Sequence, residues 1–192
     1  MKKNTIYLVA IALVAGLVGG YYLSNSSQLN QKNENAIVAT RDNCLADECL
    51  SIDELKYPVS ELSKVVIAAI EKAIDDEYKA LSVYESVIKK FGSVRPFSMI
   101  KGAEEQHIAS LKNLFDKYGL KVPVNTWTNK IAIPATLQES CQTGVDAEIA
   151  NAALYSDELL PAVTEYEDIT LVFTNLMNAS EQKHHPAFER CN

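Results

Sequence analysis

The sequence predicts an all-α protein whose main domain is a bundle of four helices, and three observations support this fold class. Only 7 Gly and 6 Pro occur in 192 residues, which disfavours a turn-rich sandwich or barrel. Four long stretches after residue 59 carry apolar residues at three- and four-residue steps, as amphipathic helices do. Two connections between these stretches are short and one is long, which predicts two antiparallel hairpins joined by one long crossover.

The composition is that of a globular protein and narrows the classes of partner. Hydrophobic residues make up 47% of the chain and charged residues 22%, so the chain can bury a sizeable core. The formal net charge is −7, from 18 basic and 25 acidic residues, and we therefore expect no nucleic-acid partner.

Residues 1–24 have the pattern of a signal anchor or signal peptide. Lys2 and Lys3 precede the apolar run 6–23, and a polar string follows it. At about 18 residues the run lies at the lower limit for spanning a bilayer, and no clear A-x-A cleavage site follows. Both alternatives place the rest of the chain outside the cytoplasm, either membrane-anchored through this segment or secreted after its cleavage.

Residues 25–59 form a polar tether and a lead-in that contains cysteines. The chain has four cysteines, an even number on the exported side: Cys44, Cys49, Cys141 and Cys191. Disulfides persist in that environment, and the C-x4-C spacing followed by two single cysteines fits no common zinc pattern. We therefore expect disulfides, with zinc binding as the alternative.

The bundle is expected over residues 60–192. Ser60 opens the first helix and Gly92 ends it, while Pro96 and Gly119 bound the second, and Pro161 is placed to end the third. The expected helices are 60–91, 96–119, 143–161 and 166–190.

The crossover 120–142 is long enough to run the length of a bundle about 30 Å tall. In this layout the start of the third helix and the end of the fourth meet at one end of the domain. We therefore expect Cys141 to pair with Cys191, and Cys44 with Cys49.

Six ionisable residues interrupt the apolar stripes of the four expected helices: Glu77, Glu104, His107, Glu148, Glu181 and His184. Two of them begin a Glu-x-x-His pair, which places a carboxylate and an imidazole on one helical face. Burying these groups without compensation would cost many kcal/mol, and metal cations are the obvious compensation. Two such pairs and two single carboxylates can hold two metal ions between the helices.

The same stretches resemble known proteins. DDEYKALSVYESVIKKFG (75–92) and AEEQH (103–107) are similar to the first helix pair of rubrerythrin-type proteins. GVDAEIANAALY (144–155) and ASEQKHHPAF (179–188) are more closely similar to an uncharacterised extracytoplasmic ferritin-like family. The resemblance covers about 60–192.

This resemblance implies a ferritin-like four-helix bundle with a non-haem di-iron site at the six residues above, in which Glu104 and Glu181 bridge the ions. Two features depart from the rubrerythrin pattern and count against a rubrerythrin-like peroxidase cycle. The cysteines lack the C-x-x-C pairs of an electron-donating rubredoxin module. Asn151 also stands where those proteins use an additional carboxylate on the third helix.

Several neighbours of these residues have both a structural and a functional interpretation. Tyr84 and Tyr155 are either core aromatic residues whose hydroxyl groups are hydrogen-bonded elsewhere, or donors of hydrogen bonds to the metal ligands. We expect His185 to face solvent. We expect Asp76 and Glu105 to lie on solvated faces. They would take the places of Glu77 and Glu104 as metal ligands only if the helical phase were shifted by one residue.

The expected function is that of an exported di-iron carboxylate protein, an oxidoreductase that reacts with O2 or peroxide or oxidises Fe(II). Its cofactors would be two iron ions, with Mn or Zn as alternatives because carboxylates and imidazoles accept all three. The alternative function is a metal-binding structural or interaction module without catalysis. The expected partners are these small substrates and, through residues 1–24, a membrane; the sequence does not specify the oligomeric state, and a dimer is compatible with it.

Overall fold

The computed structural model describes residues 57–191, all of which belong to one compact unit of the chain, Cys44–Asn192. The predicted signal segment 1–24, almost all of the polar tether, and both Cys44 and Cys49 lie outside the described residues. None of the helices in the described part is both long and apolar enough to cross a membrane.

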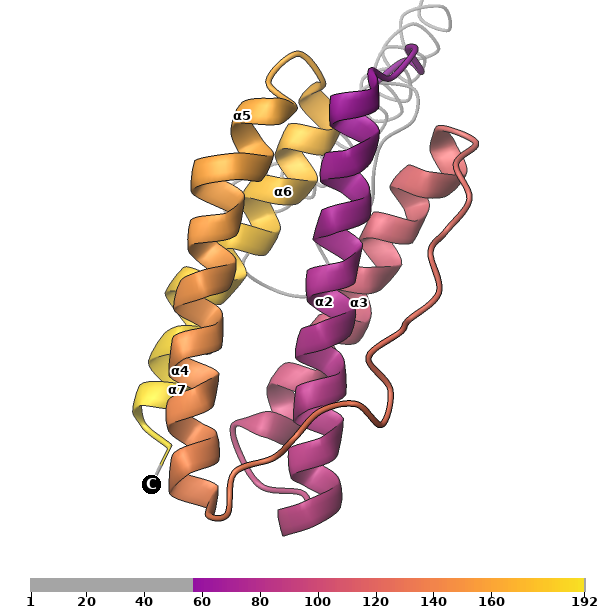
Figure 1. Cartoon of the computed structure of the whole chain (residues 1–192). Helices are drawn as coiled ribbons and strands as arrows, with labels where there is room; N and C mark the ends of the chain where they lie inside the picture. The colour runs from indigo at the N-terminus through magenta and orange to yellow at the C-terminus, as the bar shows by residue number, and fades with distance from the viewer. Residues whose placement is uncertain (1–56, 192) are drawn as a thin grey trace, which may run out of the picture. The chain divides into compact units, whose positions relative to one another are not determined.

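Four helical segments make up the described residues, which contain no strand, so the predicted all-α class is confirmed. The first two are single helices, and the last two each contain a π-helical turn. In chain order the segments are α2 (Lys64–Phe91); α3 (Phe97–Lys117); α4 (Leu137–Leu154), η1 (Tyr155–Leu159) and α5 (Leu160–Ala162); and α6 (Glu167–Ala179), η2 (Ser180–His184) and α7 (His185–Glu189). Figure 1 shows how the helices α2 to α7 are arranged.

The third segment begins at Leu137 rather than near Thr143 as the sequence predicted. A capping box fixes this start: the Thr136 hydroxyl accepts a hydrogen bond from the Glu139 backbone N–H at 3.2 Å, and the Glu139 carboxylate accepts one from the Thr136 N–H at 3.0 Å. These two bonds satisfy N–H groups that the helix itself cannot. The first helix begins similarly, with Ser63 as its cap in place of the expected Ser60.

Each π-helical turn ends two residues before a proline, η1 before Pro161 and η2 before Pro186. In an α-helix the proline ring clashes with the carbonyl four residues earlier, and a wider turn relieves that clash. Accordingly, Leu160 donates its N–H to the carbonyl five residues back, and so does His185. Pro161 therefore does not end the third segment as predicted.

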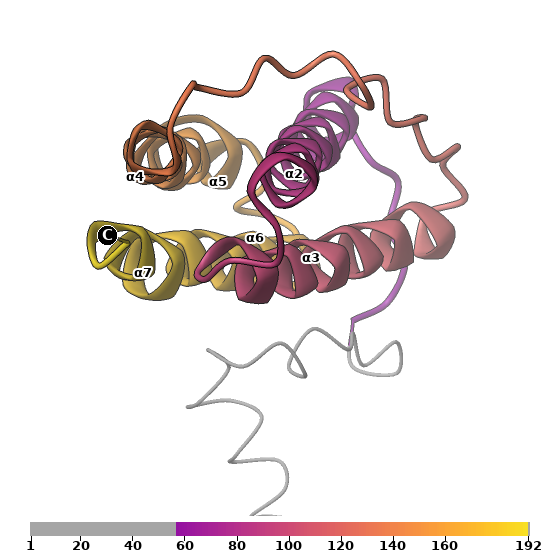
Figure 2. The same cartoon turned by 90° about the horizontal axis from the view of Figure 1, so that it is seen from below.

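Neighbouring segments run in opposite directions. Along α3 and the last segment, Lys117 forms an ion pair with Asp168 at one end, and Phe97 packs against Phe188 at the other. The connection 118–136 crosses from one hairpin to the other along the outer side of α2 (Figure 2), where the Trp127 indole donates a hydrogen bond to Asp75 at 3.0 Å. The segments thus form two hairpins joined by one long crossover.

The predicted disulfide between Cys141 and Cys191 is confirmed and joins the start of α4 to the residues after α7. The predicted pair of Cys44 and Cys49 lies outside the described residues.

The core has two apolar layers with buried polar side chains between them. One layer includes Ile70, Phe115 and Phe173, and the other is built around Phe97 and Phe188. All four segments pass from one layer to the other at a buried polar residue. The polar layer therefore lies in the middle of the bundle.

Candidate metal centre

Five of the six residues that the sequence singled out lie together in this polar layer. Each is only 1–4% exposed, and they come from all four segments: Glu77 from α2, Glu104 and His107 from α3, Glu148 from α4 and His184 from η2. Such groups are rarely buried unless they are paired or bind a metal.

The first group in this layer consists of His107 and two carboxylates. His107 Nδ1 lies 3.1 Å from Glu77 Oε2 and 3.2 Å from Glu104 Oε2. The three residues offer ligand atoms close enough to hold one metal ion.

The second group repeats this arrangement around His184. Its Nδ1 lies 3.3 Å from Glu104 Oε1 and 3.4 Å from Glu148 Oε2. These residues also form a group that could hold a metal ion, and the His107 and His184 rings stack with their centroids 5.4 Å apart. Glu104 belongs to both groups and presents one oxygen to each imidazole.

The donor atoms fit metal ions by two tests. His184 Nδ1 is buried and has no hydrogen-bond partner among the described residues, although a buried nitrogen normally has one. Neighbouring ligands of an ion bound at 2.0–2.2 Å are themselves about 3 Å apart, close to the separations found between the imidazole and carboxylate atoms here. Carboxylates and imidazoles suit iron, manganese and zinc, so the donor set does not select among these metals.

Two buried tyrosines hold the outer carboxylates of the cluster. The Tyr155 hydroxyl donates a 2.9 Å hydrogen bond to Glu77 Oε1, and the Tyr84 hydroxyl donates one to Glu148 Oε1. Each tyrosine therefore serves the glutamate of the other hairpin. Of the two interpretations of these tyrosines, the structure shows hydrogen bonds to the predicted ligands.

The electrostatics of the cluster follow from burial and close charges. Burial alone raises the pKa of Glu104, but the charge of His107 and its contacts with both imidazoles lower it to about 2. Burial and the negative charge of Glu104 raise the pKa of Glu77 to about 7. Burial and the neighbouring carboxylates also raise the pKa values of Tyr84 and Tyr155, so both hydroxyls keep their protons and remain donors.

The structure does not bring Glu181 into the buried cluster, contrary to the inward position predicted from its spacing to His184. Glu181 is exposed because it lies in the π-helical turn η2. There each residue advances by less than the roughly 100° of an α-helix, so residues four apart share a face. Ser180 and His184 are accordingly both buried.

Three side chains beside the cluster form a row of hydrogen bonds that the sequence did not predict. The Ser180 hydroxyl donates to Asn151 Oδ1, and Asn151 Nδ2 donates to Asp76, both at 2.8 Å. Asn151 thus links three segments rather than supplying a metal-binding oxygen. Of the other residues weighed as alternatives, Glu105 is exposed, whereas His185 is half-buried beside Glu189 rather than facing solvent fully, and it lines a cleft with Glu148.

Comparison with known proteins gives a structural neighbour without an established activity. No family model and no curated protein matches the chain. The crystal structure of a hypothetical protein from Methanococcus jannaschii DSM 2661 matches with a TM-score of 0.59 and 21% sequence identity. The match covers 69% of this chain and 82% of that protein. At this identity the likeness indicates a shared fold alone.

Proposed function

We propose that the chain is an exported ferritin-like di-iron carboxylate protein. In this proposal it is an oxidoreductase that reacts with O2 or peroxide or oxidises Fe(II). Residues 1–24 attach it to the membrane, or their cleavage releases it. The observation that carries the proposal is the position of Glu104 between two imidazoles, so that two groups able to hold a metal share one carboxylate.

The shared carboxylate favours two ions over one. Glu104 is kept ionised by its contacts with both imidazoles, and its two oxygens point to different histidines. Glu77 and Glu148 each add one oxygen from the outer side of a group. This set, in a bundle of two hairpins joined by one crossover, matches five of the six ligand positions of ferritin-like di-iron proteins, and the exposed Glu181 is the sixth.

Two iron ions bound here would supply the two electrons that reduce peroxide to water, or would exchange electrons with O2. The residues of the chain prepare the site for this chemistry. Tyr84 and Tyr155 each hold one oxygen of an outer carboxylate, which leaves the other oxygen facing a histidine. The apolar layers on both sides exclude bulk water and strengthen these interactions.

The alternative is a metal site that only stabilises the bundle. The nearly complete burial of all five residues favours it, because structural sites are closed whereas catalytic sites keep a position open. Zn, Mn or Fe would serve equally in this role.

Anaerobic loading with Fe(II), followed by titration with peroxide or O2, separates the two functions. The full-length chain in a mild detergent is stripped of metal, loaded with Fe(II) and followed by near-ultraviolet absorbance. We expect the absorbance to rise and to saturate at about one peroxide per two Fe(II), and added reductant to reverse it. Continued oxidation of excess Fe(II) under O2 would identify iron as the substrate. Bound zinc that iron cannot replace, or bound iron that neither oxidant affects, would contradict the oxidoreductase and leave the structural role.

A further inference from the structure

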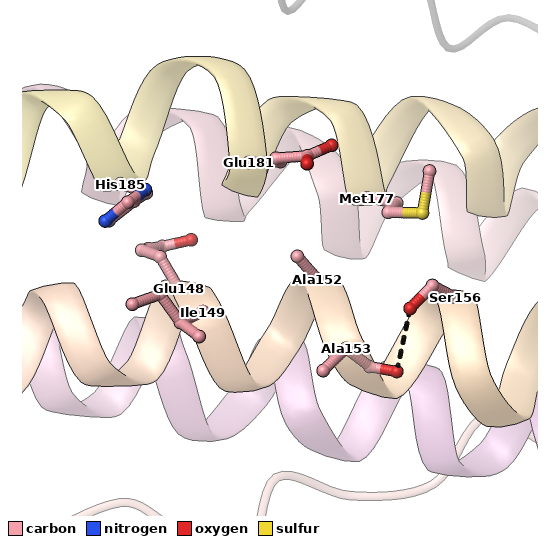
Figure 3. Close-up of a pocket in the computed structure, with 8 residues that line it drawn as sticks. All are labelled: Glu148, Ile149, Ala152, Ala153, Ser156, Met177, Glu181 and His185. Carbon is pink, nitrogen blue, oxygen red and sulfur yellow. Dashed lines mark hydrogen bonds between the residues drawn. The ribbon is translucent and has the colours of Figure 1, made fainter.

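We propose that the cleft between α4 and the α6–α7 segment is the route by which a divalent cation, Fe(II) in the proposed function, reaches the buried centre. The inference rests on the proposed function because the floor of this cleft belongs to the proposed metal site. The cleft has a volume of about 320 Å³, and Glu148 and His185 point toward one another from its two walls (Figure 3).

Glu148 connects the cleft to the centre. It lines the cleft, yet it is buried, and its Oε2 lies 3.4 Å from His184 Nδ1, which has no hydrogen-bond partner among the described residues. A cation that reaches Glu148 from the cleft therefore meets the second group of the centre next. Because His184 Nδ1 makes no hydrogen bond among the described residues, a cation that reaches it displaces no hydrogen-bond partner.

The other polar groups of the cleft suit a cation. Glu181 lines it and makes no hydrogen bond or ion pair within residues 57–191, so its carboxylate is free to bind. His185 adds an imidazole and Met177 a thioether, and no Lys or Arg lines the cleft among the described residues. Clefts lined by one sign of charge raise the local concentration of the opposite ion.

A second cleft reaches the same centre from the side between α2 and α4 and is less suited to a cation. Glu104 and Glu148 line it as well, but its volume is only about 140 Å³ and its walls carry the ammonium group of Lys79 beside apolar side chains. The carboxylate of Asp76 in this cleft is already bonded to Asn151. We therefore use this second cleft as the control path.

Two substitutions on α4 give a matched pair, because Ala152 lines the first cleft and Ala150 lines the second. Metal-free full-length protein is mixed with Co(II), and the visible absorbance of the bound ion is followed by stopped flow. We expect Ala152→Phe to slow loading about tenfold and Ala150→Phe to leave its rate unchanged. Both variants should bind as much Co(II) at equilibrium as the wild type. His185→Gln removes the imidazole from the cleft without filling space, and it should load more slowly but reach the same final Co(II) content.

The outcomes separate this inference from the proposed function. Slowing by Ala152→Phe and His185→Gln, with unchanged final Co(II) content and circular dichroism, supports the route. Equal loading rates in all variants, or slowing by Ala150→Phe alone, would overturn it while the metal centre stands. A wild-type chain that binds no Co(II) at equilibrium would instead overturn the proposed function, and this inference with it.

Discussion

Tyr155 of η1 donates a 2.9 Å hydrogen bond to the carboxylate of Glu77 on α2, although 78 residues separate them in the chain. Tyr84 of α2 makes the corresponding bond to Glu148 of α4. Both tyrosines are buried, and each stands seven residues after the glutamate of its own segment while it bonds the glutamate of the other. Each hairpin thus supports a carboxylate of the other in the candidate metal centre.

Removal of either hydroxyl should weaken both metal binding and the metal-free fold. We expect Tyr155→Phe and Tyr84→Phe each to lower metal affinity about 10- to 100-fold, as loss of a group that orients a ligand does. Each should destabilise the metal-free protein by about 1 to 3 kcal/mol, because a buried carboxylate oxygen loses its donor. Competition with a chromophoric chelator measures the affinity.

Tyr78→Phe is the matched control, since the Tyr78 hydroxyl bonds the Pro123 carbonyl of the crossover and does not touch the cluster. Equal affinity in all three variants would contradict the supporting role of the buried tyrosines.

The stability of the metal-free protein should fall as pH rises. Burial alone lowers the pKa of His184, but its close contacts with Glu104 and Glu148 outweigh burial and raise the pKa to about 9. Because this folded value exceeds the unfolded value of about 6.5, the charged imidazole stabilises fully below pH 6.5. That contribution, about 3 kcal/mol, is lost as pH rises from 6.5 through 9.

Urea unfolding of metal-free wild type and His184→Gln between pH 6 and 10 checks this sign. The difference between their free energies of unfolding should shrink over that range. A difference that stays constant or grows with pH would show that the imidazole is not held protonated by these carboxylates.

Gly144 should be required by the packing of α4 against α7. A Cβ atom at this position would lie 2.5–2.7 Å from ring atoms of Phe188, which is fully buried. We expect Gly144→Ala to destabilise the protein by roughly 1 to 3 kcal/mol, because the two segments must separate. Gly102→Ala is the control in α3, where nothing lies within 4 Å and the expected change is a stabilisation of about 0.4 to 1 kcal/mol. Equal melting temperatures for the two variants would disprove this packing constraint.

The sequence predicted the helices and most of the polar layer because both depend on periodicity. The stripes through Glu77, Glu104 and Glu148 continue in regular α-helix, so three- and four-residue steps place these side chains correctly. The disulfide followed from the same topology, since opposite directions bring Cys141 to Cys191.

The failures come from local departures from this periodicity. The position of Glu181 was wrong because η2 changes the helical phase just before Pro186, and a spacing rule assumes a constant phase. The start of α4 at Leu137 could have been predicted from the sequence, since Thr136 and Glu139 form the T-x-x-E pattern of a capping box. The hydrogen bond of Tyr155 to Glu77 could not be predicted from the sequence. It joins two segments whose relative positions along the bundle axis are fixed only in the folded protein.

The iron content of the wild type and of two variants at neighbouring positions tests whether two bound ions share Glu104. Full-length wild type, Glu104→Gln and Glu105→Gln are loaded anaerobically with Fe(II), desalted and analysed for iron. Glu104 is the carboxylate shared by both groups, and Glu105 is exposed one residue away. We therefore expect about two iron ions per chain for wild type and Glu105→Gln, and fewer than one for Glu104→Gln. Equal iron content in Glu104→Gln and Glu105→Gln would contradict a dinuclear centre built on Glu104.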